Sequence, residues 1–297
     1  MMTGNPPSHQ TRELKPPAVS HRGFNLARYA TGALVVFAFG LFVYGLAWNY
    51  ATRRYLRGFS DAIIPLDASA EMKTEALLRW FREEPKRLDT SVEGAGQLRD
   101  PVTIVQNKQL LKVCGSASNA FINLADAAGL KTRRLLLIAE SGNVMHVVAE
   151  VQWDHRWVAV DPQQGRVFRD HVGRALSKEE LRDPAVFQDA IRGMPGYNPE
   201  YTFAHTHHIH LQRIPLGNFL RGILTRYFPG WEGAVNWAYL LENPSLWPII
   251  ISIPLFFLGN LLNWLVGYYG RKKLGINTLG LSRQLLRAGR ALLHGWA

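Results

Sequence analysis

The stretch from Lys112 to Asp161 decides the fold of this chain: KVCGSASNAFINLADAAGLKTRRLLLIAESGNVMHVVAEVQWDHRWVAVD. Residues 115–128 are rich in Ala and Ser, and their apolar side chains recur at helical spacing. This pattern predicts a largely buried helix that ends at Gly129. Three later segments are rich in β-branched and apolar residues and are predicted strands: 133–139, 144–153 and 156–161. A helix followed by an antiparallel sheet indicates an α+β fold.

Three side chains capable of acyl-transfer chemistry lie at the ends of these elements. Cys114 would begin the helix, where unpaired N–H groups and the positive end of the helix dipole favour a thiolate. If the last two strands form a hairpin closed by Asp154–His155, His146 becomes the diagonal neighbour of Asp161 on one sheet face. The carboxylate could then orient the imidazole, and the imidazole could accept the thiol proton. Position alone leaves Cys114 equally compatible with a small buried core residue.

The order of these elements resembles the transglutaminase-like superfamily, in its bacterial membrane-anchored form. The similar elements are a cysteine opening an Ala-rich helix, then GLKTRRL, then His146 on a strand, and WVAVDP further on. The resemblance implies a papain-like core with a Cys-His-Asp triad. In it Cys114 is the nucleophile, His146 the base and acid, and Asp161 the residue that orients the imidazole. It covers roughly residues 100–166 of 297.

Three positions depart from the family's pattern. Lys112 replaces a frequent glycine two residues before the cysteine, Val148 replaces an aromatic residue after the histidine, and Gln163 replaces a threonine after Asp-Pro. We expect these positions to face the substrate, so the departures bear on substrate choice more than on the triad. An oxyanion also needs hydrogen-bond donors. The N–H of Cys114 is one candidate and the side chain of Gln109 is a weaker second.

Two further helical segments and one irregular segment are predicted around this core. Asp67 is expected to cap a helix that runs to Glu84 and presents Met72 on its apolar face. Ser177 is expected to cap a short helical turn reaching Arg182. The composition of residues 193–204 predicts an irregular segment.

The net charge of +11 belongs mainly to the two ends of the chain. Residues 1–28 carry four basic residues and one acidic residue, and residues 271–297 carry six basic residues and no acidic one. The remainder is therefore nearly neutral, which does not support a nucleic-acid partner. A single cysteine excludes an internal disulfide.

Two uncharged stretches are long enough to cross a membrane as helices. For the first stretch, an uncleaved anchor is favoured over a cleaved signal peptide, because bulky residues follow it. The expected order is a disordered tail (1–28), a transmembrane helix (29–52), a catalytic domain (53–215), an amphipathic aromatic membrane-proximal segment (216–246), a second transmembrane helix (247–270) and a basic amphipathic tail (271–297).

The basic tails indicate how the chain is oriented in the plasma (inner) membrane. Positive charge favours the cytoplasmic side, so a two-pass chain would have both termini in the cytoplasm. The catalytic domain would then be extracytoplasmic, or periplasmic. Arg53, Arg54 and Arg57 argue locally against this orientation.

The leading hypothesis is a membrane-anchored cysteine enzyme that performs acyl transfer or hydrolysis at amide or peptide bonds. Its expected substrates are peptides, proteins or amine-bearing glycopolymers of the cell envelope. The expected partners are the lipid bilayer and other membrane proteins, and no cofactor is expected. One alternative is a catalytically silent scaffold with the same fold.

Another alternative is a metal-binding protein that uses His205, His207, His208 and His210. No Cys, Asp or Glu lies within that run, and its spacing also suits one face of a strand. A polar membrane-proximal segment is therefore the favoured interpretation of these histidines.

Overall fold

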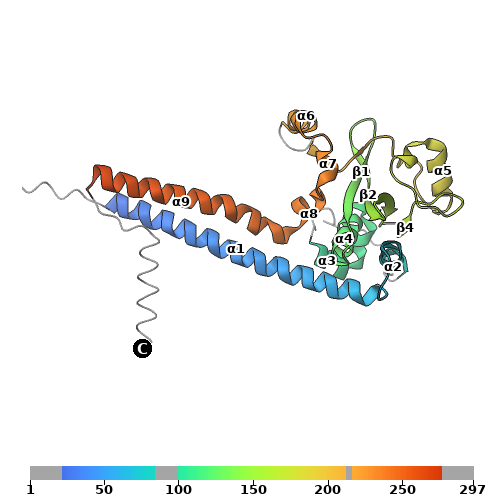
Figure 1. Ribbon diagram of the computed structural model, residues 1–297, viewed down its shortest axis with the longest axis horizontal. Coiled ribbons are helices and arrows are strands. Elements are labelled where there is room, and N and C mark those ends of the chain that lie inside the picture. Colours follow the sequence, from blue (N-terminus) through green and yellow to red (C-terminus); the bar gives the residue numbers. More distant parts are fainter. Residues whose placement is uncertain (1–21, 84–99, 212–215, 276–297) are drawn as a thin grey trace, which may run out of the picture. The chain divides into compact units, whose positions relative to one another are not determined.

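The computed structural model describes residues 22–83, 100–211 and 216–275. Predictions for the first residues of the tail, for Glu84 and for most of the basic tail lie outside these ranges. The chain divides into two compact units. One unit comprises Leu41–Ile251, and the other combines Met1–Gly40 with Ser252–Ala297. Figure 1 labels the helices and several of the strands.

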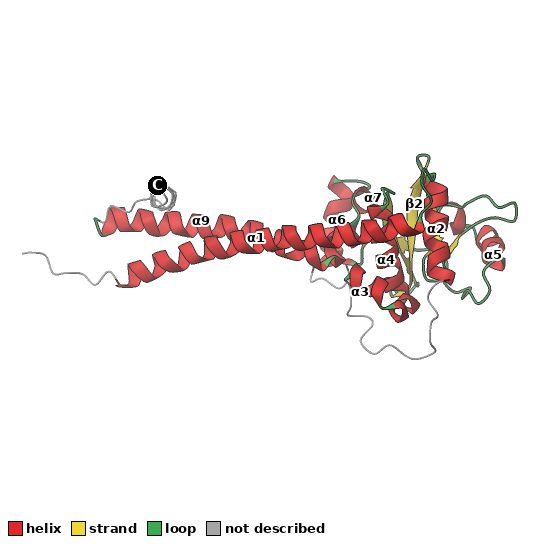
Figure 2. Cartoon of the chain, turned by 90° about the horizontal axis from the view of Figure 1, so that it is seen from below, coloured by secondary structure: helices red, strands yellow, loops and turns green. Residues whose placement is uncertain are grey.

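The Leu41–Ile251 unit contains a five-stranded antiparallel sheet (Figures 1 and 2). Its spatial order is β4-β3-β2-β1-β5, and each neighbouring pair runs antiparallel. The strands are β1 (Thr132–Ile138), β2 (Val144–Trp153), β3 (Arg156–Asp161), β4 (Arg166–Val167) and β5 (Thr206–His207). With the helices described below, this sheet confirms the α+β class.

Helices and short turns surround the sheet. They are α2 (Ala70–Glu83), α3 (Pro101–Gln106), η1 (Lys108–Lys112), α4 (Cys114–Ala127), η2 (Glu180–Arg182), α5 (Pro184–Arg192), α6 (Gly217–Tyr227), α7 (Trp231–Ala234), α8 (Trp237–Glu242) and η4 (Pro244–Leu246). Helix α4 buries Phe121 and Leu124 in the main core, which it shares with Val151 and Val158 of the sheet. A second core lies on the opposite sheet face and includes residues of α5. The sheet is therefore covered on both faces.

The predicted hairpin register is confirmed. Trp153 pairs with Arg156, and the two residues between them have positive φ angles, 42° for Asp154 and 70° for His155. Positive φ at both central residues is the requirement of a two-residue type I′ turn, whose twist matches that of the strands. Because the turn has two residues, His146 and Asp161 fall on the same sheet face.

The predicted start of α2 is wrong. The helix begins at Ala70, and the Ser69 hydroxyl, not Asp67, accepts a hydrogen bond from the N–H of Met72 at 3.2 Å. Asp67 instead adopts a left-handed conformation with φ 56°. Met72 is 53% exposed, so it does not belong to the buried face of this helix. Serine and aspartate both cap helices, and sequence alone did not separate them.

The predicted cap at Ser177 is confirmed. The Ser177 N–H donates to the Glu180 carboxylate at 2.8 Å, and the Glu180 N–H donates to the Ser177 hydroxyl at 3.3 Å. This reciprocal pair is a capping box. Helix α5, which follows directly, has its own cap in Asp183 and was not predicted.

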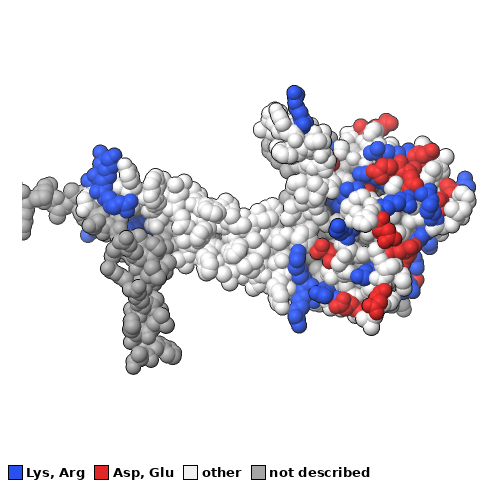
Figure 3. Space-filling model, viewed as in Figure 1, with Lys and Arg blue, Asp and Glu red and all other residues white. Residues whose placement is uncertain are grey.

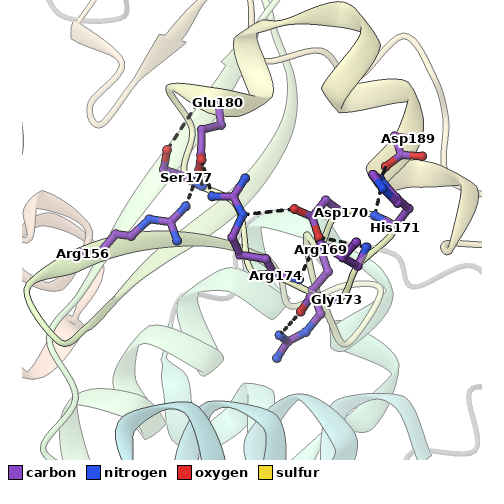
Figure 4. A network of polar contacts seen from close by, with 10 residues as sticks. Arg156, Arg169, Asp170, His171, Gly173, Arg174, Ser177, Glu180 and Asp189 are labelled. Atoms are coloured by element: carbon purple, nitrogen blue, oxygen red, sulfur yellow. Dashed lines mark hydrogen bonds and ion pairs between the residues drawn. The ribbon is translucent and has the colours of Figure 1, made fainter.

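Ion pairs fix the loop between β4 and α5 (Figure 4). Arg174 lies 3.1 Å from Asp170 and 2.6 Å from Glu180, and Arg156 at the β2–β3 turn also pairs with Glu180. Burial opposes ionisation of Glu180, but the Ser177 N–H and the two guanidinium groups lower its pKa to about 2. The loop is thereby tied to the hairpin that carries the predicted site.

Among the residues that the structure describes, two helices are long and apolar enough to cross a membrane, judged by length and composition: α1 (Arg22–Ile63) and α9 (Trp247–Lys273). Charged side chains gather on the surface of the sheet-containing unit, whereas the surfaces of α1 and α9 between their charged ends are uncharged (Figure 3). Helix α1 begins at Arg22, so residues 22–28 are helical and the prediction of disorder there is wrong.

The segment predicted to be amphipathic contains α6. Leu224 on one face packs with Ile209, Leu211 and Trp231 in a small core. Other apolar side chains of this segment are exposed: Leu216, Phe219, Leu220, Ile223 and Tyr227. Their spacing of three or four residues places them on one stripe of the helix.

Candidate active site

Cys114 is the first residue of α4, as the sequence predicts. Its side chain is partly buried beside Leu136, Ile138 and Val147. The Ser118 hydroxyl, one turn further along α4, donates to the Val147 carbonyl at 2.9 Å and ties the helix to β2. The start of α4 is therefore held against the strand that carries His146.

His146 and Asp161 form a buried pair. The His146 Nε2 atom lies 2.7 Å from the Asp161 Oδ2 atom, and the side chains are 2% and 0% exposed. The other oxygen of Asp161 accepts a hydrogen bond from the N–H of Gln164 at 3.0 Å. Because Nε2 donates to the carboxylate, Nδ1 is the nitrogen left for a second partner. The neighbour that acts on the imidazole besides Asp161 is Cys114, because a side-chain hydrogen bond between Cys114 and His146 shifts the pKa of both groups.

The electrostatics of the site favour charge separation. Burial opposes ionisation of Cys114, but the hydrogen bond and charge of His146, with backbone hydrogen bonds at Val147 and Gly115, lower its pKa below 9.0. Burial likewise opposes protonation of His146, but hydrogen bonds to Asp161 and Cys114 raise its pKa from 6.5 to about 9. Both shifts favour the charged forms, and a thiolate beside an imidazolium is the reactive form of a cysteine nucleophile.

Two tyrosines of the irregular segment complete the surroundings of His146. The Tyr201 ring stacks on the imidazole, with centroids 4.5 Å apart and planes 8° from parallel. Tyr197 meets the same imidazole edge-on at 6.0 Å, and burial raises the pKa of its hydroxyl. Sequence reasoning missed both residues, because their one signal was aromatic content in a Gly- and Pro-rich stretch.

Two of the three departures from the family's pattern contact each other. The Gln163 amide donates to the Lys112 carbonyl at 2.5 Å, so the turn after Asp161 is tied to the segment before Cys114. Val148, the third departure, is fully buried in the second core. The expectation that all three positions face a substrate is therefore wrong for Val148.

Gln109 lies in η1, the turn that leads into α4. Its backbone N–H donates to the Asn107 side chain at 3.3 Å. This places the residue upstream of Cys114 on a capped, ordered turn. Its role as an oxyanion donor stays a prediction.

The four clustered histidines do not share one centre. His207, in β5, lies 3.5 Å from Glu232, whereas His208 lies 2.8 Å from the Arg134 carbonyl and 3.6 Å from Glu150. His205 and His210 are not part of a strand. Within the described ranges, no three His, Cys, Asp or Glu side chains gather as they would around a metal ion.

A second buried carboxylate lies on β2. Glu150 is 0% exposed and pairs with Arg133 at 2.7 Å, and Lys178 lies 4.0 Å away. Burial lowers the pKa of His208 beside it, and the charges of Lys178 and Arg133 act in the same direction. These influences favour the neutral form of His208, whereas the pKa of His146 is raised.

The site geometry provides the basis for comparison with known proteins. No protein-family model matches the chain, and no curated protein is significantly similar to it.

Proposed function

We propose that this protein is a membrane-anchored thiol enzyme of the transglutaminase-like type, with a papain-like core. The observation that carries the proposal is the hydrogen-bonded line from Cys114 through His146 to buried Asp161. A nucleophile, a base in contact with it and a third group that orients the base are the recurring parts of acyl-transfer sites. In this role Cys114 attacks, His146 moves the proton and Asp161 holds the imidazole.

The first half-reaction makes a thioester. The Cys114 thiolate attacks the carbonyl carbon of an amide or peptide, and the carbonyl electron pair moves to oxygen as the C–S bond forms. When the carbonyl re-forms, the C–N bond breaks and the imidazolium of His146 gives its Nδ1 proton to the leaving amine. His146 is then neutral and beside an acyl-enzyme.

The second half-reaction restores the site. Neutral His146 takes a proton from water or from an acceptor amine, which attacks the thioester and breaks the C–S bond. Water gives hydrolysis, and an amine gives a cross-linked product. We propose peptides, proteins or amine-bearing glycopolymers of the cell envelope as substrates, since the proposed location exposes the site to them.

Membrane anchoring is the second part of the proposal. Helices α1 and α9 meet the length and composition requirement, and α6 offers a face of exposed apolar and aromatic side chains suited to a membrane–water boundary. We propose a two-pass topology in which both termini are cytoplasmic and the thiol unit is extracytoplasmic. Modification of Cys114 in intact cells by a membrane-impermeant maleimide tests it; reaction only after lysis would contradict this orientation.

The pH dependence of Cys114 alkylation by iodoacetamide tests the catalytic part. The protein has one cysteine, so the rate reports this thiol alone. We expect a midpoint well below the free-thiol value of about 8.5, and a return towards that value in His146→Ala. His205→Ala, which removes an exposed histidine outside the site, is the matched control and should leave the midpoint unchanged.

A slow alkylation that is insensitive to His146→Ala would instead favour a catalytically silent scaffold. The altered residues Lys112 and Gln163, which contact each other beside the thiol, are the observation that favours this second candidate. Cys114→Ser separates the two candidates. Full biological function of that variant, with normal folding and membrane insertion, would exclude the enzyme.

A further inference from the structure

A cavity of about 480 Å³ lies within the Leu41–Ile251 unit, away from the thiol. It is bounded by the last turns of α1, by the C-terminal end of α4 and by α8. Its charged and aromatic lining consists of Arg53, Arg57, Asp61, Lys73, Asp126 and Tyr239. The proposed acyl-transfer reaction uses none of these side chains.

The cavity lies where the apolar part of the chain ends. Arg53 is the first charged residue after the uncharged stretch 29–52. Its Nε atom donates to the Tyr239 hydroxyl at 2.8 Å, and Asn49, one turn earlier on α1, donates to Ser245 at 3.0 Å, just before Trp247 begins α9. The ends of both uncharged segments therefore meet beside this cavity. In a membrane-anchored chain, that level is the one occupied by lipid headgroups.

The side chains that line the cavity carry more positive than negative charge. Three cations face two carboxylates, which leaves one net positive charge. Lys73 donates to the Ala128 carbonyl at 3.0 Å and Arg53 is bound to Tyr239. Among the residues that the structure describes, Arg57 has neither a hydrogen bond nor an ion pair. An arginine with unused donors matches the paired oxygens of a phosphate.

We propose that this cavity binds the phosphate of a phospholipid headgroup from the bilayer around α1 and α9. Arg57 would donate to the phosphate oxygens, with Arg53 as a second cation and the Tyr239 ring at the interface. One net positive charge matches a phosphodiester, which carries a single negative charge, better than a polyanion. The proposal rests on the membrane anchoring proposed above and is independent of the thiol chemistry.

This assignment gives the membrane-proximal arginines a role. Basic residues that follow a transmembrane segment normally mark the cytoplasmic side, so Arg53 and Arg57 conflict with the topology that the tails indicate. A bound lipid phosphate would offset the positive charge of these arginines on the extracytoplasmic side of the membrane. Helix α4 lines the cavity with its last turn and carries Cys114 at its first, and its 14 residues span about 20 Å. Lipid bound in the cavity would thus anchor the far end of the helix that presents the thiol.

Native mass spectrometry of the full chain in dodecyl maltoside, with added phosphatidylglycerol, tests the proposal. We expect one retained lipid, and about tenfold weaker affinity in Arg57→Gln, because a charge-assisted phosphate contact is lost. Arg54→Gln is the matched control. It removes the same charge from a position three residues earlier on α1 that does not line the cavity, where the guanidinium donates to the Tyr50 hydroxyl at 3.4 Å. We expect this variant to keep the wild-type affinity.

Equal weakening in both variants would overturn the proposal, because it would show diffuse attraction of lipids to exposed arginines. Unchanged affinity in both would also overturn it. Displacement of the lipid by inorganic phosphate at matched concentration would show a site for free phosphate and overturn the lipid source. Resistance of each variant to alkaline carbonate extraction is measured in parallel. Release of the protein there contradicts membrane anchoring, whereas retention without lipid binding contradicts the cavity alone.

Discussion

Two buried histidines each lie beside a buried carboxylate, with opposite electrostatic results: His146 of β2 lies beside Asp161, and His208 lies beside Glu150 of β2. His146 lies 2.7 Å from Asp161, and hydrogen bonds to that carboxylate and to Cys114 raise its pKa to about 9 in spite of burial. His208 lies 3.6 Å from Glu150, and burial lowers its pKa. The first region is built to hold a charged imidazole and the second to hold a neutral one.

The two carboxylates differ in the groups that balance their negative charge. Glu150 is paired with Arg133 and has Lys178 nearby, so its charge is largely satisfied before His208 contributes. Asp161 receives His146 on one oxygen and a backbone N–H on the other. At His208, burial and the charges of Lys178 and Arg133 outweigh the effect of Glu150, whereas at His146 the hydrogen bonds and charges of Asp161 and Cys114 outweigh burial. Contact with a carboxylate alone is therefore a poor indicator of a catalytic histidine.

Glu150→Gln should have the largest effect. It leaves the cations of Arg133 and Lys178 without their carboxylate, so we expect the free energy of unfolding to fall by about 3–5 kcal/mol. Chemical denaturation in detergent, followed by tryptophan fluorescence, measures the loss. The pH midpoint of Cys114 alkylation should stay unchanged in the folded protein. A shifted midpoint would show that Glu150 is electrostatically coupled to the Cys114–His146 pair.

Asp161→Asn should affect reactivity more than stability. The amide keeps the shape of the carboxylate but not its charge, so the pKa of His146 should fall from about 9 towards 6.5. We expect Cys114 alkylation near neutral pH to slow by about 10- to 100-fold, since each pKa unit corresponds to a factor of ten. An unchanged rate would mean that Asp161 does not support the imidazolium.

The dependence of stability on pH should distinguish the coupled pair from a lone histidine. The raised pKa of His146 contributes stability that is complete below 6.5 and is lost as pH rises through about 9. The lowered pKa of Cys114 contributes stability that is present above 9.0 and is lost as pH falls through its folded value. Where these ranges overlap, the wild-type loss and gain offset each other.

Removing the Cys114 thiol should leave only the contribution of His146 to the pH dependence of stability. In Cys114→Ser the free energy of unfolding should decline as pH rises above 6.5, with a slope of at most about 1.4 kcal/mol per pH unit. Denaturation midpoints of the two proteins across this range measure the difference. Parallel curves for wild type and Cys114→Ser would contradict a thiolate–imidazolium pair.

Tyr201→Leu should give the smallest of these effects. Loss of the ring that stacks on His146 removes an interaction worth about 0.5–1.5 kcal/mol, and the aromatic face favours the charged imidazole. We expect the pKa of His146, followed by NMR of its ring protons, to fall by about half a unit to one unit. Tyr201→Phe keeps the ring and should retain the wild-type value. Equal shifts in both variants would assign the effect to the hydroxyl.

Much of the candidate site could be predicted because it depends on short-range rules. The Ala-rich segment after Cys114 is a helix, and Gly129 follows its end with a positive φ of 79°. The two-residue turn at Asp154–His155 fixes the hairpin register, and the alternation of side chains then places His146 and Asp161 on one face. The length of this turn, the glycine that ends this helix and strand parity involve neighbouring residues, so the sequence by itself determined them.

Only the tertiary structure decided what surrounds that pair. The stacking of Tyr201 on His146, the bond from Gln163 to the Lys112 carbonyl and the burial of Val148 all depend on how distant segments pack. The same holds for His208, whose pKa is lowered first by its burial and then by the charges of Lys178 and Arg133, which come from distant parts of the chain. Composition and periodicity carry no information on which distant side chains meet, and those meetings set both the charge of each histidine and the shape of each cavity.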